Sequence, residues 1–120
     1  VLEELRRRGY RLGVISNSED GQAERLVRLV GLLPFFDFCL DSYVFGSAKP
    51  DPAIFLHAVE QLGTAPGETV YVGDMFMQDV QGSQGAGLRA VLLDPFGLHP
   101  DAGVTRVRSL RELPELLGGG

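Results

Sequence analysis

Two aspartates five residues apart, Asp74 and Asp79, give the strongest chemical signal in this sequence. Residues 70–72 before them are apolar or aromatic, as in a buried strand, and Gly73 ends that run. A carboxylate after such a strand lies at the mouth of an open α/β sheet, where ligands bind. A second acid one helical turn later can face the same point, and the two charges repel by about 4 kcal/mol at a protein surface. We therefore predict a Mg²⁺ site here, because magnesium prefers oxygen ligands and would relieve the repulsion.

Two other polar segments suit the binding of an anion. Ser16 and Asn17 follow the run RLGVI, and a hydroxyl with free backbone N–H groups at a strand end can hold a phosphate oxygen. Lys49 is followed by two prolines in AKPDP, which stiffen the loop that presents its point charge. Taken singly, each feature has a simpler interpretation. Ser16 and Asn17 are common turn residues, Lys49 can be a solvated loop lysine, and Asp74 can cap a helix. Together they fall in a fixed order on one predicted rim.

Strand-like and helix-like segments alternate along the whole chain. This alternation predicts an α/β fold, a Rossmann-like parallel sheet with helices on both faces. Connections between parallel strands are right-handed, so every strand end sends its loop to the same rim. The predicted strands are residues 11–16, 38–40, 69–72, 89–93 and 106–107, the predicted helices are residues 1–8, 21–30, 52–62, 76–86 and 110–117, and residues 41–50 are predicted to form a long loop.

The composition of the 120 residues fits one domain, which we place at residues 1–117, followed by a flexible glycine tail at residues 118–120. The formal net charge of −5 argues against nucleic-acid binding, which needs a basic surface. No apolar run reaches the roughly 18 residues that span a bilayer, so we expect no membrane association. The single cysteine, Cys39, excludes an internal disulfide and fits a reducing, cytoplasmic setting.

These motifs carry a resemblance. The sequence resembles the C-terminal part of the haloacid dehalogenase-like (HAD) hydrolase superfamily, of its phosphatase-like branch. AKPDPAIF with Lys49 is similar to the family's third motif, and GDMFMQD with Asp74 and Asp79 is similar to the fourth. VISN with Ser16 matches the second motif, a strand that ends in Ser or Thr, and QGSQGAGLRAVLL is similar to the family's usual continuation. The resemblance extends from residue 1 to residue 117.

The resemblance implies a role for each of these residues. Ser16 would hydrogen-bond a phosphoryl oxygen, with Asn17 lining the site beside it. Lys49, the implied catalytic residue, would steady the nucleophile and the transferred group. Asp74 would ligate Mg²⁺, and Asp79 would ligate the ion or orient its water. The implied substrate is a small phosphorylated metabolite whose identity the family's cap domain largely sets, and the GDxxxxD form points to phosphate chemistry rather than to carbon–halogen cleavage.

The family's first motif, DxDxT, does not occur in these 120 residues. In the family its leading aspartate attacks phosphorus and forms an aspartyl-phosphate. We therefore expect the first strand and the cap domain to lie upstream, and this chain, as a truncated core, to have negligible phosphatase activity. In the family that strand lies between the strands that end at Ser16 and Val72. Without it, we expect those two strands either to pair directly or to accept a second copy of the chain in a homodimer, because unpaired buried backbone groups are costly.

Three functions are compatible with these observations. The first is the C-terminal core of a magnesium-dependent HAD-like hydrolase. The second is a non-catalytic module of the same fold that binds an oxyanion or serves in assembly. The third is a receiver-like domain in which Asp74 accepts a phosphoryl group, and the late position of Asp74 in the chain weakens this interpretation.

Overall fold

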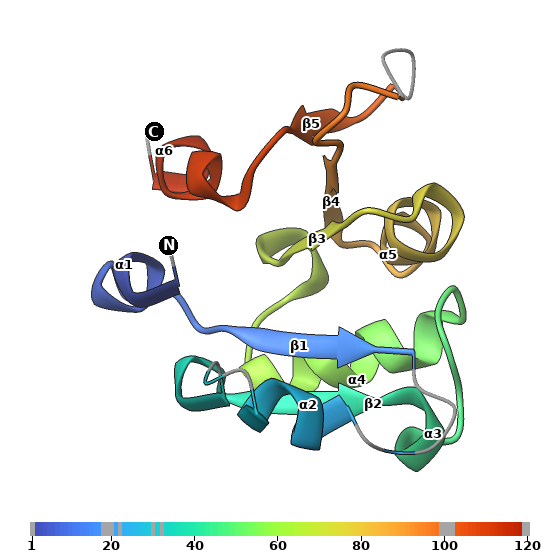
Figure 1. The fold of residues 1–120 in the computed structure, drawn as a ribbon. Coiled ribbons are helices and arrows are strands. Elements are labelled where there is room, and N and C mark those ends of the chain that lie inside the picture. The colour runs from blue at the N-terminus through green and yellow to red at the C-terminus, as the bar shows by residue number, and fades with distance from the viewer. Residues whose placement is uncertain are drawn as a thin grey trace.

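The computed structural model of this chain describes residues 2–17, 21, 23–29, 31, 33–98 and 103–118. The strands found in this part of the chain form a two-stranded and a three-stranded sheet, and every pair is parallel, as predicted. Figure 1 shows the two-stranded sheet below the three-stranded one. The first sheet has the order β1 (Gly13–Ser16), β2 (Phe38–Asp41), and the second has the order β3 (Val70–Gly73), β4 (Arg89–Leu93), β5 (Thr105–Val107).

Helices cover both faces of these sheets. In Figure 1, α2 lies in front of the β1–β2 pair and α4 lies behind it. Short 3₁₀ turns occur at Leu33–Phe35, Pro66–Glu68 and Leu110–Glu112, and a π-helical segment occurs at Phe76–Gln81. None of the helices in the described ranges is both long and apolar enough to cross a bilayer. The α-helices are α1 (Leu2–Arg7), α2 (Ala23–Leu29), α3 (Ser42–Phe45), α4 (Pro52–Leu62), α5 (Gly82–Gly85) and α6 (Leu113–Gly118).

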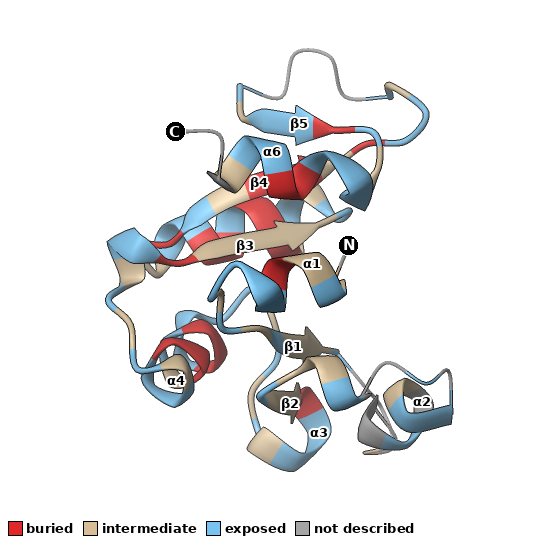
Figure 2. Ribbon diagram, turned by 90° about the vertical axis from the view of Figure 1, so that its left-hand side faces the viewer, coloured by how far each residue is buried: buried red, intermediate tan, exposed pale blue. Residues whose placement is uncertain are grey.

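Helix α4 joins the two sheets through its apolar face. Its start is set by Asp51, whose carboxylate accepts a hydrogen bond from the backbone N–H of Ala53, and it ends at Gly63, which has a left-handed φ of 72°. Ile54 and Phe55 on this helix are fully buried. Their cluster packs against Ile15 and Leu40 of the first sheet and against Tyr71 of the second. Figure 2 shows the buried face of α4 turned toward the strands.

A second cluster lies on the other side of the three-stranded sheet. Val91, Val107 and Leu113 form it, and partly buried side chains from β3, β4 and α6 pack around it. Helix α6 therefore covers the face of this sheet opposite α4 and α5. The predicted tail is only partly described, because α6 runs to Gly118 and residues 119–120 lie outside the described part.

Two local predictions were wrong. The loop expected at residues 41–50 contains helix α3, which starts because the Asp41 carboxylate accepts the N–H of Tyr43 and ends because Gly46 is left-handed with φ 94°. The single helix expected at residues 76–86 is a π-helical turn followed by the short helix α5. In that turn the N–H of Val80 reaches the carbonyl of Met75, the wider spacing of a π-helix.

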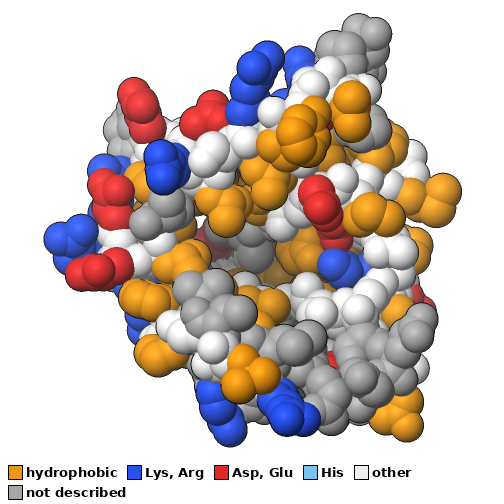
Figure 3. All heavy atoms as spheres, in the orientation of Figure 1, with side chains coloured by type: hydrophobic (Ala, Val, Ile, Leu, Met, Phe, Trp, Pro, Cys, Tyr) orange, Lys and Arg blue, Asp and Glu red, His pale blue; other side chains and the backbone are white. Residues whose placement is uncertain are grey.

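The direct pairing of the strands that end at Ser16 and Val72 is also not what the structure shows. Within the described residues, β1 pairs with β2 and β3 pairs with β4, and no ladder joins β1 to β3. The buried cluster of Phe55 packs against both Ile15 on β1 and Tyr71 on β3, so side-chain packing rather than a backbone ladder connects the two strands. In the space-filling view the surface is hollowed between the two halves, with hydrophobic side chains around the hollow (Figure 3).

Candidate functional site

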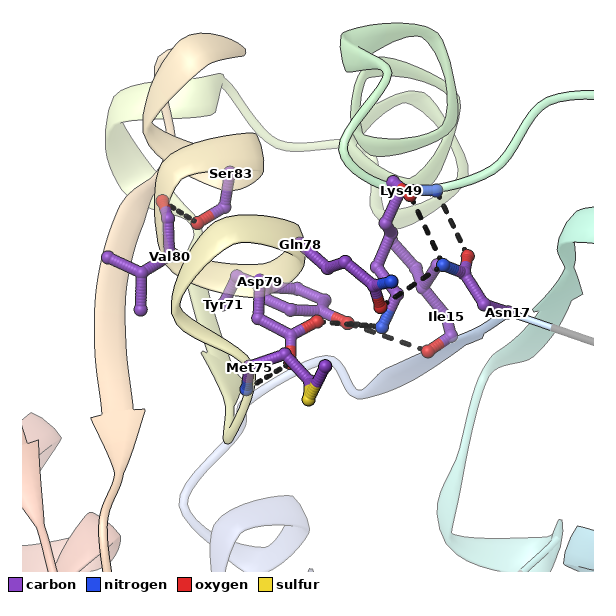
Figure 4. A network of polar contacts seen from close by, with 9 residues as sticks. All are labelled: Ile15, Asn17, Lys49, Tyr71, Met75, Gln78, Asp79, Val80 and Ser83. Atoms are coloured by element: carbon purple, nitrogen blue, oxygen red, sulfur yellow. Dashed lines mark hydrogen bonds and ion pairs between the residues drawn. The ribbon is translucent and has the colours of Figure 1, made fainter. Parts of the chain in front are cut away.

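The ammonium group of Lys49 lies at the centre of a polar network between the two sheets. Its Nζ atom donates to Asp79 Oδ1 at 2.7 Å and to Tyr71 Oη at 3.0 Å. The Lys49 side chain is 10% exposed and that of Asp79 is 4% exposed, so this ion pair is buried. Figure 4 shows the lysine descending from its loop to meet the strand residue Tyr71 and the π-helix residue Asp79. Two sequence-predicted site residues, 30 positions apart, are thus in direct contact.

The surroundings keep this lysine protonated. Burial acts against the charged form, but the neighbouring Tyr71 and the hydrogen bond to Asp79 outweigh it and raise the pKa of Lys49 above its ordinary value. Burial also raises the pKa of the Tyr71 hydroxyl, although the Lys49 ammonium opposes this shift. At neutral pH the group at the centre of the site is therefore a fixed cation beside a neutral phenol.

Asn17 ties the loop after β1 to the loop that carries Lys49. Its side-chain Oδ1 accepts the backbone N–H of Lys49 at 3.0 Å, and its Nδ2 donates to the Lys49 carbonyl at 3.2 Å. The same Nδ2 donates to Gln78 Oε1 at 3.3 Å, which adds the segment after β3 to the network. The three predicted rim segments therefore meet, and the side chain of Asn17 contacts the lysine backbone in this arrangement (Figure 4).

Asp79 uses both carboxylate oxygens in contacts with the protein. Oδ1 accepts from Lys49, and Oδ2 accepts the backbone N–H of Met75 at 2.9 Å. Gly73 makes room for the side chain of Asp79, because a Cβ atom on Gly73 would lie 2.3 Å from Asp79 Cγ. The glycine of the GDxxxxD motif is thus required by close packing and not by an unusual backbone angle.

Ser16 and Asp74 lie at the carboxyl ends of β1 and β3. Ser16 is half-buried and pairs in register with Asp41, and Asp74 is exposed directly after Gly73. Within the described part of the chain, neither side chain has a protein hydrogen-bond partner, so both hydroxyl and carboxylate are available to a ligand. Among the same residues, no group of three or more His, Cys, Asp or Glu side chains is placed to hold a metal ion.

Comparison with known proteins identifies the family of this chain. The model of the haloacid dehalogenase-like hydrolase family matches residues 1–87. The chain belongs to this family. The resemblance drawn from the motifs is therefore confirmed. Membership also favours the hydrolase over the receiver-like interpretation, since the matching family is one of hydrolases.

Individual relatives match nearly all of this chain. Phosphoserine phosphatase from Thermus thermophilus is 42% identical over 117 residues, which cover 93% of this chain and 46% of the relative. The crystal structure of a HAD phosphatase from Thermococcus onnurineus has a TM-score of 0.90 and 39% identity, covering 98% of this chain and 55% of that one. A 2-haloacid dehalogenase from Pseudomonas syringae has a TM-score of 0.86 and 36% identity, covering 98% and 50%. The chain thus spans about half the length of the relatives it matches, and the predicted Rossmann-like α/β fold is confirmed.

Tyr71 and Gln78 contact predicted site residues, although neither is predicted as a site residue from the sequence. The aromatic ring of Tyr71 indicates only a buried strand, and Gln78 lies unmarked between the two aspartates. A signal for Tyr71 did exist, because a buried tyrosine hydroxyl usually has a hydrogen-bond partner and this one lies three positions before Asp74. No comparable signal marks Gln78.

A pocket of about 370 Å³ lies elsewhere, between β2, α3 and α4. Cys39, Asp41, Phe45 and His57 are among its lining residues, and the rings of Phe45 and His57 lie 5.0 Å apart with their planes tilted by 37°. None of the predicted site residues lines it. The predicted site residues therefore lie at the rim between the sheets and not at this pocket.

Proposed function

We propose that this chain is the phosphate- and metal-binding part of a magnesium-dependent phosphohydrolase of the HAD-like family. The observation that carries the proposal is the buried contact of 2.7 Å between Lys49 and Asp79, at the rim where the loops after β1 and β3 meet. A fixed cation at the mouth of a parallel sheet suits the oxygens of a phosphate monoester. Ser16 and Asn17 would line the phosphate site, and Lys49 would neutralise the charge of the transferred group.

The two aspartates fit a magnesium ion in their donor chemistry. Asp74 is exposed and has no protein partner in the described part of the chain. Each oxygen of Asp79 accepts one hydrogen bond, which leaves it lone pairs. Mg²⁺ keeps several waters and is commonly held by one or two carboxylates with substrate phosphate oxygens. Asp74 would hold the ion, Asp79 would hold it or orient its water, and the bound ion would neutralise charge on the phosphate.

Phosphate chemistry is favoured over dehalogenation by the acidic pair. Solved HAD phosphatases and dehalogenases both match the fold, so overall similarity does not separate the two reactions. The difference lies in the residues after β3, where Asp74 and Asp79 supply two carboxylates for a cation. We therefore propose a small phosphorylated metabolite as the substrate class. The single cysteine of the sequence supports the further proposal of a reducing, cytoplasmic setting.

A second candidate is a non-catalytic module that binds an oxyanion or serves in assembly. It is favoured by the edges of β1 and β3, which lack strand partners in the described ranges. A second copy that pairs with these edges would give a homodimer. Light scattering that finds a strict monomer would remove the homodimer from this proposal.

Thermal unfolding in the presence of single ligands tests the proposed site. Mg²⁺ alone, or inorganic phosphate alone, at ten times its dissociation constant should stabilise the folded chain by about 1.4 kcal/mol. That corresponds to a rise of about 6 °C in Tm for a chain of this length. Asp74→Asn should remove the rise caused by Mg²⁺, whereas Glu68→Gln, at the opposite end of β3, should keep it. No rise with either ligand would overturn the proposal.

A further inference from the structure

The donor count of Lys49 leaves one position for a ligand. A lysine ammonium has three N–H bonds. One points to Asp79 Oδ1 and one to Tyr71 Oη, and the backbone of the same lysine is held by Asn17. Among the described residues, no protein acceptor takes the third N–H bond. Its direction is set by the two partners that hold the other donors.

Tyr71 is the more rigid of these two partners. Its ring lies edge-on against the buried Phe55, with centroids 5.0 Å apart and planes at 88°. Its hydroxyl lies 3.5 Å from the carbonyl of Ile15 on the facing strand, a long hydrogen bond. A tyrosine side chain has only two torsion angles to fix, so this packing leaves the hydroxyl little freedom. Lysine has a flexible four-carbon stem and depends on its partners for a defined position.

The Tyr71 hydroxyl also connects the two sheets. No ladder joins β1 to β3 in the described ranges, but Tyr71 on β3 reaches the backbone carbonyl of Ile15 on β1 through its hydroxyl. The hydroxyl therefore lies between the strands, at the level of the rim where Lys49 ends (Figure 4).

We propose that Tyr71 is a positioning residue for this site: its hydroxyl orients the Lys49 ammonium so that the remaining N–H bond faces an incoming oxyanion. The inference rests on the proposed function for the identity of the oxyanion. Asp79 alone would balance the charge, but a single acceptor leaves the ammonium free to turn about that contact. The second acceptor fixes the orientation.

A purely structural role for Tyr71 makes a different prediction. If the ring only packs against Phe55, Tyr71→Phe keeps that contact and leaves the ammonium unaffected. If the hydroxyl orients the lysine, the same variant frees one N–H bond and the ammonium becomes mobile. The matched control is Tyr10→Phe, because Tyr10 precedes β1 at the end of the strand away from the rim.

The composition makes this measurable, because Lys49 is the only lysine in the chain. In protein labelled with ¹⁵N-lysine, the side-chain NH₃⁺ group gives a single NMR signal at neutral pH. We expect this signal to be sharp in the wild type and in Tyr10→Phe, and to be broadened by exchange with water in Tyr71→Phe. Titration with inorganic phosphate should shift the wild-type signal, and its Kd should be about tenfold weaker in Tyr71→Phe. A sharp signal and unchanged Kd in Tyr71→Phe would overturn the inference.

Two further outcomes keep the test decisive. If phosphate fails to shift the wild-type signal, the proposed function is wrong, while the width of the ammonium signal in Tyr71→Phe still decides whether Tyr71 orients Lys49. If Tyr71→Phe does not fold, the wild type supplies the answer through nuclear Overhauser effects between the ammonium protons and the Tyr71 ring. Their absence would contradict the 3.0 Å contact and end the inference.

Discussion

Replacing Gly73 with alanine should displace the carboxylate of Asp79. A Cβ atom at position 73 would lie 2.3 to 2.4 Å from three atoms of Asp79, whereas ordinary van der Waals contact begins at 3.4 Å. The aspartate must therefore move by about 1 Å, because neither group can be compressed by that amount. A shift of this size is incompatible with keeping both the 2.7 Å contact to Lys49 and the 2.9 Å bond from Met75.

The expected loss of stability follows from two contributions. Overpacking of a close-packed site costs about 1–3 kcal/mol. Removing one partner of a buried ion pair costs about 3–5 kcal/mol, and a displaced partner should cost a fraction of that. We expect Gly73→Ala to lower the free energy of unfolding by about 3 kcal/mol. With a urea m-value of about 1.5 kcal/mol/M, the unfolding midpoint should fall by about 2 M.

Urea unfolding followed by circular dichroism measures this change. Gly67→Ala is the matched control, because a Cβ atom there meets nothing within 4 Å, and it should stay within about 0.5 kcal/mol of the wild type. In an Asp79→Gly background the obstructing side chain is gone, so adding Gly73→Ala should cost little. The reasoning is refuted if Gly73→Ala is as stable as the control, or if its cost is the same in both backgrounds.

Three other predictions concern the same network. The free energy of unfolding should fall as the pH rises above about 10. The pKa values of Lys49 and Tyr71 are raised in the folded state, so the unfolded chain releases protons that the folded chain still holds. Urea midpoints at pH 8 to 11 check this, and a flat profile would contradict it. Asn17→Ala should lower Tm by about 4 °C, because it removes three hydrogen bonds worth about 1 kcal/mol in total at an exposed position. An unchanged Tm in calorimetry would contradict this. The 120-residue chain with Mg²⁺ should hydrolyse an aryl phosphate no faster than buffer does, and turnover that Asp74→Ala abolishes would show that the chain carries its own nucleophile.

Much of the fold was predictable because its signals are local. The bounds of β4 agree with the predicted strand at residues 89–93, and α4 begins at Pro52 and ends at Leu62 as its cap residues indicate. Helix α3 was missed because its four residues carry no apolar period, and only the hydrogen bond of Asp41 reveals it. Short capped turns of this kind depend on one side-chain contact, which the sequence pattern does not express.

The candidate site was predictable in its members but not in its contacts. Lys49 and Asp79 could be assigned to one rim from the order of strands and loops. Their direct contact was not predictable, and neither was the contact of Asn17 with the lysine backbone. Both contacts depend on the directions of side chains from three separate segments. The split into two sheets was equally hidden, because strand patterns show which residues are buried and not which edges pair.

The packing of α4 against both sheets has a consequence for dynamics. The cluster that contains Phe55 packs against Ile15 in the first sheet and Tyr71 in the second, so α4 completes the core that the two sheets share, while the second cluster covers the other face of the three-stranded sheet. Amide hydrogens in β1 should therefore exchange with deuterium when α4 detaches, whereas those in β3, which the second cluster also covers, should keep greater protection.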